Sequence, residues 1–166
     1  TRHARNDPAR GSLYTHGEWK MMLYKSHKLL VTLLLALLMC SGLAMAEEAK
    51  PHKLVIQVST DDARTQSIAM NNAVNLQKHF GPENVDIEIV AYGPGLGMLT
   101  KNSEQAQRVS DLAMQDIRFS ACGNTMDKIE KKSGKRPELA EGVGTVPAGV
   151  VRIMELQGQG YAYIRP

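Results

Sequence analysis

From residue 53 onward, short apolar runs alternate with segments in which apolar residues recur at helical spacing. The short runs predict strands at 53–59, 85–92, 117–121, 143–146 and 161–164. The longer segments predict helices at 60–80, 103–115, 124–133 and 147–157. Strands separated by helices of this length form βαβ units, so we expect a mainly parallel sheet covered by helices on both faces.

Polar, glycine and proline residues mark several of these boundaries. Asp61 and Asp62 are interpreted as caps of the first long helix rather than as acid or base catalysts. The run GPGLG at 93–97 predicts a backbone-permissive loop. A phosphate-binding loop is the alternative, and it is disfavoured because Pro94 lacks a donor N–H.

Three asparagines lie inside the first long helix, at positions 71, 72 and 75. Asparagine is a poor residue for a helix interior, so the three together cost about 1–2 kcal/mol relative to alanine. We expect a subunit interface, or side-chain hydrogen bonds to neighbouring loops, to offset this cost.

A leader precedes the first strand. Lys25 and Lys28 come before the apolar run at 29–39, and small residues then end at Ala46. This order is typical of a secretory signal peptide over 21–46, and we predict cleavage after Ala46. In a bacterium with two membranes, export would place the mature protein in the periplasm.

The leader has two alternative fates. Lipidation at Cys40 is disfavoured because the bulky Met39 precedes it, and an uncleaved anchor would be short against the roughly 20 residues of a spanning helix. We therefore expect no stable membrane insertion after cleavage. Residues 1–20 are interpreted as an upstream extension or tag, which leaves 47–166 as a single domain large enough for one core.

Net charge excludes one class of partner. The chain carries a formal charge of +3, but removing the six basic and two acidic residues before position 47 leaves 14 basic and 15 acidic residues. A near-neutral exported domain does not indicate nucleic-acid binding. Its one basic cluster favours a solvated helix face over a docking patch; the cluster comprises Lys128, Lys131, Lys132, Lys135 and Arg136.

Cys122 is the only cysteine outside the leader, and it stands between the predicted strand at 117–121 and the next helix. A thiol at a helix N-terminus is near unsatisfied N–H groups and the positive end of the helix dipole, which favour the nucleophilic thiolate. The alternative is an inert core thiol. A thiol oxidoreductase is disfavoured because no CxxC pair is present.

In parallel α/β sheets, ligands bind beyond the carboxyl ends of the strands. The loops after the second and third predicted strands therefore place candidate substrate-binding residues near the catalytic candidate Cys122. These residues are Tyr92, Gly93, Pro94, Gly95, Gly123, Asn124 and Thr125. Histidines at 52 and 79 have no partners at metal-ligand spacing, so we expect no metal site.

Three stretches resemble the DsrE/DsrF-like family, in particular its small exported members: VDIEIVAYGPGLGML, FSACGNTM and TVPAGVVRIMELQGQGYAYIRP. The resemblance implies a five-stranded parallel sheet in a three-layer α/β/α sandwich, usually as a homo-oligomer. It also relates the chain to subunits that pass sulfane sulfur along a relay of cysteine persulfides. Cys122 matches the family's cysteine at the end of the third strand.

These inferences together predict an exported persulfide carrier. Cys122 would take sulfane sulfur from a donor protein or small sulfur compound and pass it to an acceptor thiol, without a metal, nicotinamide, flavin or other cofactor. Gly123, Asn124 and Thr125 would stabilise the anion through their backbone N–H groups. The alternative is a non-catalytic small-ligand-binding or assembly protein of the same fold, in which Cys122 is buried.

Overall fold

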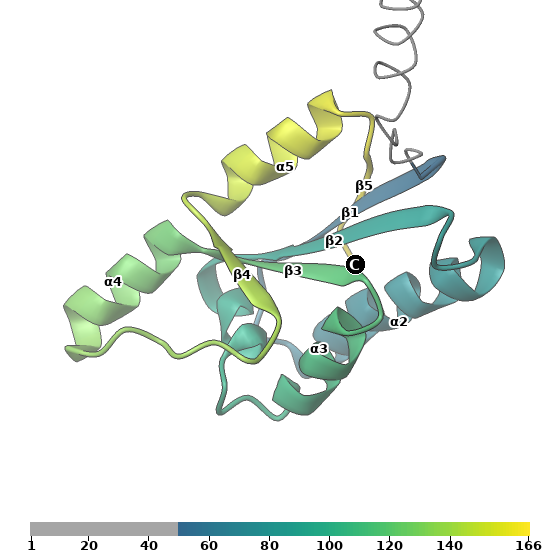
Figure 1. Ribbon diagram of the computed structural model, residues 1–166. Coiled ribbons are helices and arrows are strands. Elements are labelled where there is room, and N and C mark those ends of the chain that lie inside the picture. The colour runs from purple at the N-terminus through teal and green to yellow at the C-terminus, as the bar shows by residue number, and fades with distance from the viewer. Residues whose placement is uncertain (1–49) are drawn as a thin grey trace, which may run out of the picture. The chain divides into compact units, whose positions relative to one another are not determined.

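A computed structural model describes residues 50–166, so the predicted extension and signal peptide lie outside the described residues. Strands and helices alternate along this part of the chain (Figure 1). The strands are β1 (His52–Val58), β2 (Val85–Ala91), β3 (Ile117–Cys122), β4 (Val143–Val146) and β5 (Ala162–Ile164). The helices are α2 (Ala63–Phe80), the 3-10 helix η1 (Gly93–Leu99), α3 (Ala106–Ala113), α4 (Gly123–Ser133) and α5 (Gly149–Gly158).

The five strands form one parallel sheet in the order β4-β3-β2-β1-β5. Three successive crossovers step in one direction, from β1 to β4, and the last returns across the sheet to β5. Because such crossovers are right-handed, the reversal places α5 on the face opposite α2 and α3 (Figure 1). The predicted parallel α/β/α sandwich is confirmed.

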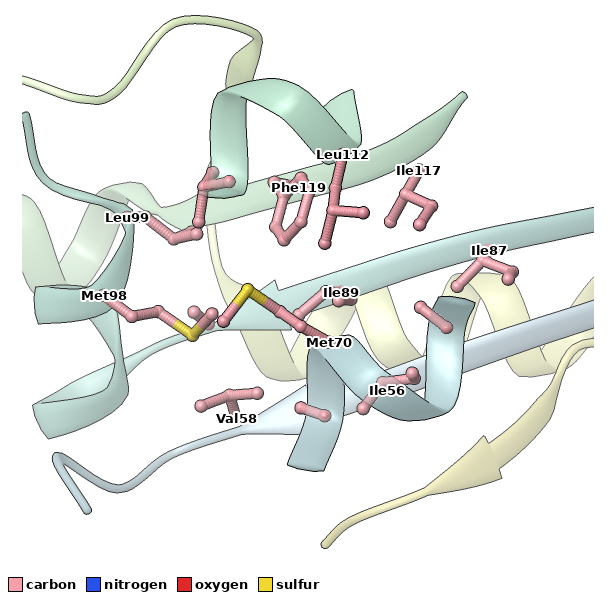
Figure 2. Packing of buried hydrophobic residues seen from close by; sticks show 14 of the residues in the cluster. Ile56, Val58, Met70, Ile87, Ile89, Met98, Leu99, Leu112, Ile117 and Phe119 are labelled. Carbon is pink, nitrogen blue, oxygen red and sulfur yellow. The ribbon is translucent and has the colours of Figure 1, made fainter. Parts of the chain in front are cut away.

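The larger apolar core fills the face covered by α2 and α3 (Figure 2). Alternate residues of the three central strands point into it, as the two-residue period of a strand requires. Met70 of α2, Leu112 of α3 and Met98 of η1 pack against them. A smaller apolar cluster joins α5 to the opposite face, through Val55, Val90, Ile153, Leu156 and Tyr161.

The first long helix begins directly after one of its two predicted caps. Asp62 is the N-cap, and its carboxylate accepts a hydrogen bond from the Thr65 N–H at 2.7 Å. Gly81 ends the helix with φ of 86°, a conformation that favours glycine. Inside the helix, the Asn71 side chain accepts a 2.6 Å hydrogen bond from Arg108 of α3. For this asparagine the compensating partner is a neighbouring helix, rather than a loop.

Two predicted elements differ from the structure. The glycine-rich stretch after β2 forms the 3-10 helix η1 instead of a loop, because Leu96, Met98 and Leu99 are buried in the larger core. The helix predicted over 103–115 is shorter, Ala106–Ala113. Its C-terminal end is followed by Asp116 with φ of 64°, which the α-helix does not accommodate.

Within residues 50–166, no helix combines the length and the apolar character needed to cross a membrane.

Candidate functional site

Cys122 lies at the junction between the last residue of β3 and the first turn of α4. Its backbone is extended, and α4 begins at the next residue, Gly123. A Cβ atom at Gly123 would lie 3.1 Å from the Val146 carbonyl oxygen at the end of β4. The absence of a side chain at Gly123 therefore lets α4 start directly beside the neighbouring strand.

A second helix N-terminus also approaches Cys122. Helix α5 begins at Gly149, and a Cβ atom there would lie 3.4 Å from the Cys122 Cβ and 2.9 Å from the Tyr92 Cδ1. Only glycine fits this space without displacing a neighbour. The positive ends of α4 and α5 therefore both approach the thiol.

Cys122 is 5% exposed, yet it belongs to neither apolar cluster. Burial raises the pKa of its thiol, but hydrogen bonding from the Thr125 side chain and from the N–H groups of Gly149, Thr125 and Asn124 outweighs burial, so the pKa is lowered from 9.0. The Cys122 side chain makes no capping hydrogen bond to α4. The interactions with these donors are therefore weak, because sulfur is a weak hydrogen-bond acceptor. The site favours thiolate through several donors rather than one.

Thr125 connects the thiol to the start of η1. Its hydroxyl oxygen accepts a hydrogen bond from the Gly93 N–H at 3.1 Å, while its hydroxyl group interacts with Cys122. Gly93 has φ of 54°, a left-handed conformation that a residue with a side chain rarely adopts. The start of η1 is therefore held against the first turn of α4.

The predicted substrate-binding residues do not all face the thiol. Tyr92 contacts Gly149, and Gly93 contacts Thr125, so both lie in the immediate surroundings of Cys122. Pro94 and Asn124 are exposed. Gly95 is buried against β1, because a Cβ atom there would lie 2.4 Å from the Val58 carbonyl oxygen. Gly95 thus has a packing contact away from the thiol.

A shallow groove of about 380 Å³ runs beside Thr125 between η1 and α4. We call it the η1–α4 groove. Its lining residues are Gly93, Pro94 and Gly97 from η1, and Thr125, Lys128, Ile129 and Lys132 from α4. It therefore contains three of the predicted substrate-binding residues and two lysines of the basic cluster.

The two residues of the basic cluster that follow α4 are paired. Lys135 forms a 2.9 Å ion pair with Glu138, and Arg136 bridges Asp127 and Glu130 of α4. Among the described residues, Lys128, Lys131 and Lys132 form no ion pair. The unpaired positive charge of the cluster thus lies on α4.

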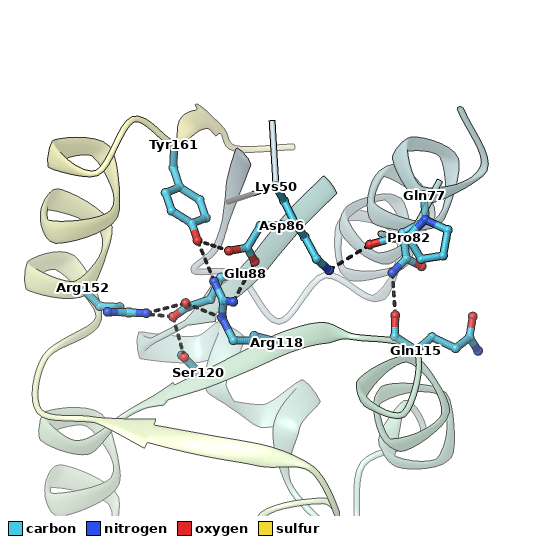
Figure 3. Close-up of polar contacts among 10 residues, drawn as sticks. All are labelled: Lys50, Gln77, Pro82, Asp86, Glu88, Gln115, Arg118, Ser120, Arg152 and Tyr161. Carbon is cyan, nitrogen blue, oxygen red and sulfur yellow. Dashed lines mark hydrogen bonds and ion pairs between the residues drawn. The ribbon is translucent and has the colours of Figure 1, made fainter. Parts of the chain in front are cut away.

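A buried ion-pair network attaches α5 to the sheet (Figure 3). Glu88 of β2 is 1% exposed, and both its oxygens accept hydrogen bonds from Arg152 of α5, at 2.8 and 2.7 Å. Ser120 and Arg118 of β3 also donate to Glu88. Burial raises the pKa of Glu88, but these donors outweigh it, so the pKa is lowered. Glu88 is therefore held as a carboxylate.

Arg118 extends the same network to an acidic and an aromatic side chain. Its guanidinium forms a 2.7 Å ion pair with Asp86 and donates to the Tyr161 hydroxyl at 2.9 Å (Figure 3). Burial raises the pKa of Tyr161, so its hydroxyl stays protonated and donates to Asp86. The network holds both Arg152 of α5 and Tyr161, three residues after its end, so it also fixes the position of Gly149.

Gly149, Glu88 and Arg152 were not among the candidate residues from the sequence. The stretch Pro147-Ala148-Gly149 marks a helix start, which was the available signal for Gly149. Glu88 occupies a polar position in an alternating strand, a pattern that does not distinguish a solvated face from one covered by a helix. Pairing it with Arg152, 64 residues later, requires the fold.

No three His, Cys, Asp or Glu side chains of residues 50–166 gather in a way that could hold a metal ion.

Comparison with solved structures agrees with this arrangement. A protein of unknown function, MTH1491 from Methanobacterium thermoautotrophicum, is 38% identical, with a TM-score of 0.62 over 69% of this chain and 99% of that one. The ychN protein from E. coli has a TM-score of 0.55 at 11% identity, over 69% of this chain and 98% of that one, and shares the fold. A comparison with curated proteins found no match.

A model of the DsrE/DsrF-like family matches residues 52–166. The matched segment begins with β1 and includes every strand of the sheet, Cys122 and both helices whose N-termini approach it. The chain therefore belongs to the DsrE/DsrF-like family.

Proposed function

We propose that this protein carries sulfane sulfur as a persulfide on Cys122. The observation that carries the proposal is the convergence of two helix N-termini and the Thr125 hydroxyl on one thiol. Family membership supports a sulfur-relay role, and the lowered pKa of Cys122 supplies thiolate, the form that attacks sulfur.

The proposed transfer needs no external oxidant or reductant. The Cys122 thiolate attacks the outer sulfur of a donor R–S–SH, a new S–S bond forms, and the donor S–S bond breaks with its electron pair leaving on R–S⁻. The product is Cys122–S–SH. An acceptor thiolate then attacks the outer sulfur of this persulfide, which returns Cys122 to thiolate.

The test is the intact mass of the folded protein before and after incubation with a sulfane-sulfur donor, with Cys122→Ser as the matched control. We expect the mass of one added sulfur on the parent protein, removed by a reductant and absent from the variant. A folded parent protein that gains no sulfur would contradict the carrier function.

A second candidate function is a non-catalytic small-ligand-binding or assembly protein. The burial of Cys122 favours it, because only 5% of the residue is exposed. Iodoacetamide labelling separates the two candidates, since a reactive low-pKa thiol is alkylated quickly at about pH 6 and an inert core thiol is not. Labelling only after denaturation would support the binding protein.

We further propose that the protein is a homo-oligomer that meets its donor and acceptor at the exposed rim around Cys122. An apolar stripe on the outer face of α5 supports self-association, because Val150, Val151 and Met154 are 58, 50 and 69% exposed. These residues are spaced as neighbours on one helix face, opposite the face that packs on the sheet.

We also propose that the protein is exported to the periplasm. The support for export is the order of charged, apolar and small residues over 21–46. Expression of the whole reading frame, followed by fractionation and N-terminal sequencing, should give a periplasmic protein that begins at Glu47. A cytoplasmic protein that keeps residues 21–46 would contradict it.

A further inference from the structure

The two lysines of the η1–α4 groove have no acidic partner among the described residues. Lys128 and Lys132 lie one turn apart on α4, a spacing at which like charges repel. The acidic residues of the same helix, Asp127 and Glu130, are instead bound to Arg136. Among the described residues, no acid forms an ion pair with either groove lysine. The groove therefore presents an uncompensated cationic side.

Between these charges the groove surface is mostly carbon. Pro94 and Ile129 supply apolar side chains, and Gly97 supplies none. A Cβ atom built on Gly97 would meet nothing within 4 Å, so the η1 wall is open at this point. A volume of about 380 Å³ falls within the range of small-molecule sites. The groove suits a molecule that has both a carbon chain and an anionic group.

The distances between groove residues along α4 favour some sulfur compounds over others as ligands. Thr125 stands at the end of the groove nearest the thiol, since its hydroxyl interacts with Cys122. Lys128 and Lys132 follow three and seven residues later, or about 4.5 and 10 Å along the helix axis at 1.5 Å per residue. An anion such as thiosulfate carries its charged oxygens next to its outer sulfur, so it does not span this length. An organic thiol with carboxylates several bonds away does.

We propose that the η1–α4 groove binds a carboxylate-bearing organic thiol or persulfide of low molecular mass, with its carboxylates on Lys128 and Lys132 and its sulfur toward Cys122. The inference rests on the proposed carrier function for its meaning, because it names the class of molecule that Cys122 would exchange sulfur with. The binding itself does not depend on the chemistry of the thiol.

Binding is therefore tested without the thiol, by isothermal titration calorimetry of S-methylglutathione into Cys122→Ser protein. We expect saturable binding that weakens roughly tenfold in Lys128→Gln/Lys132→Gln, the size expected from two exposed ion pairs. Lys131→Gln is the matched control, because this lysine lies on the same helix outside the groove, and it should bind as the parent does. The diethyl ester of the probe should bind more weakly.

A second variant keeps the test independent of charge. Leucine at Gly97 would project into open space, so Gly97→Leu should fill the groove, abolish binding and leave the circular dichroism spectrum unchanged.

Absence of binding in the parent, equal loss in Lys131→Gln, or unchanged binding of the ester would overturn the inference. If persulfide forms on Cys122 but the probe does not bind, only the groove assignment fails. If the probe binds but no persulfide forms, the carrier function fails and the groove remains a ligand site.

Discussion

Thr125 is the residue through which the ionisation of Cys122 can be changed without removing the thiol. In Thr125→Val, the hydroxyl that interacts with the sulfur is lost at nearly constant volume. Because this hydroxyl lowers the pKa of Cys122, its loss should raise that pKa toward the ordinary value of a thiol. The thiolate fraction below that pKa falls accordingly.

The measurement is the iodoacetamide rate of Cys122 as a function of pH. The midpoint should move upward in Thr125→Val, with slower alkylation near neutral pH and an unchanged plateau at high pH. Thr125→Ser keeps the hydroxyl and should keep the midpoint. An identical midpoint in the valine variant would mean that the backbone donors alone set the pKa.

Gly149 tests the contribution of the second helix to the same thiol. Gly149→Ala would place a Cβ atom 2.9 Å from Tyr92 and 3.4 Å from the Cys122 Cβ, so the first turn of α5 must move. We expect a higher pKa of Cys122 and a loss of about 1–3 kcal/mol in unfolding free energy from overpacking. Alkylation against pH and urea denaturation measure the two effects.

Gly158→Ala is the matched control at the other end of α5. A Cβ atom there meets nothing within 4 Å, so the change should leave the alkylation midpoint unmoved and stabilise the helix by up to about 1 kcal/mol. Equal effects of the two substitutions would refute a specific role for the close approach at Gly149.

At the scale of elements, the Glu88–Arg152 pair determines how α5 sits on the sheet. Glu88→Gln leaves the partly exposed guanidiniums of Arg152 and Arg118 facing a neutral amide, and losing hydrogen bonds to a charged group costs about 1.5–3 kcal/mol. Glu155→Gln removes an exposed partner of Arg152 at 3.6 Å and should cost under about 1 kcal/mol. Urea denaturation at neutral pH compares them.

The pH dependence of this loss has a definite sign. Because the pKa of Glu88 is lowered in the folded protein, its contribution to stability is complete above its ordinary value of 4.5 and is lost as pH falls through the folded pKa. The difference in unfolding free energy between the parent and Glu88→Gln should therefore shrink in acid. A difference that stays constant from neutral pH into the acid range would contradict an ionised Glu88.

The elements that the sequence predicted well are those fixed by local signals. Buried parallel strands are short apolar runs, so their predicted boundaries agree with the structure within one residue, and Asp62 and Gly81 cap the two ends of α2. The segment η1 was mistaken for a loop because its glycines suggest a turn, while burial of Leu96 by distant strands decides its conformation.

The candidate site likewise has one part that local sequence predicts and another that depends on the fold. Cys122 at a strand-to-helix junction follows from neighbouring residues, so the sequence was sufficient to find it. The approach of Gly149, and the network that fixes α5, depend on contacts between segments far apart in the chain. No periodicity in the sequence specifies which arginine will face Glu88, because that choice is made by the order of strands in the sheet.

At the scale of the whole molecule, the outer face of α5 is the surface on which the proposed oligomer depends. Met154→Glu puts a charge at the centre of the stripe formed with Val150 and Val151, and a charge buried without a partner is costly. We expect the parent to give an oligomeric mass by size-exclusion chromatography with light scattering, and the variant to give a smaller one.

Met114→Glu is the matched control, because Met114 is 79% exposed but lies after α3, away from this stripe. A monomeric parent would refute the oligomer, and equal dissociation by both substitutions would place the interface elsewhere. Helix α5 also supplies the Gly149 N–H that interacts with Cys122, so the pH midpoint of Cys122 alkylation should be measured in Met154→Glu as well. This midpoint stays unchanged only if the site of each subunit is complete without its neighbour.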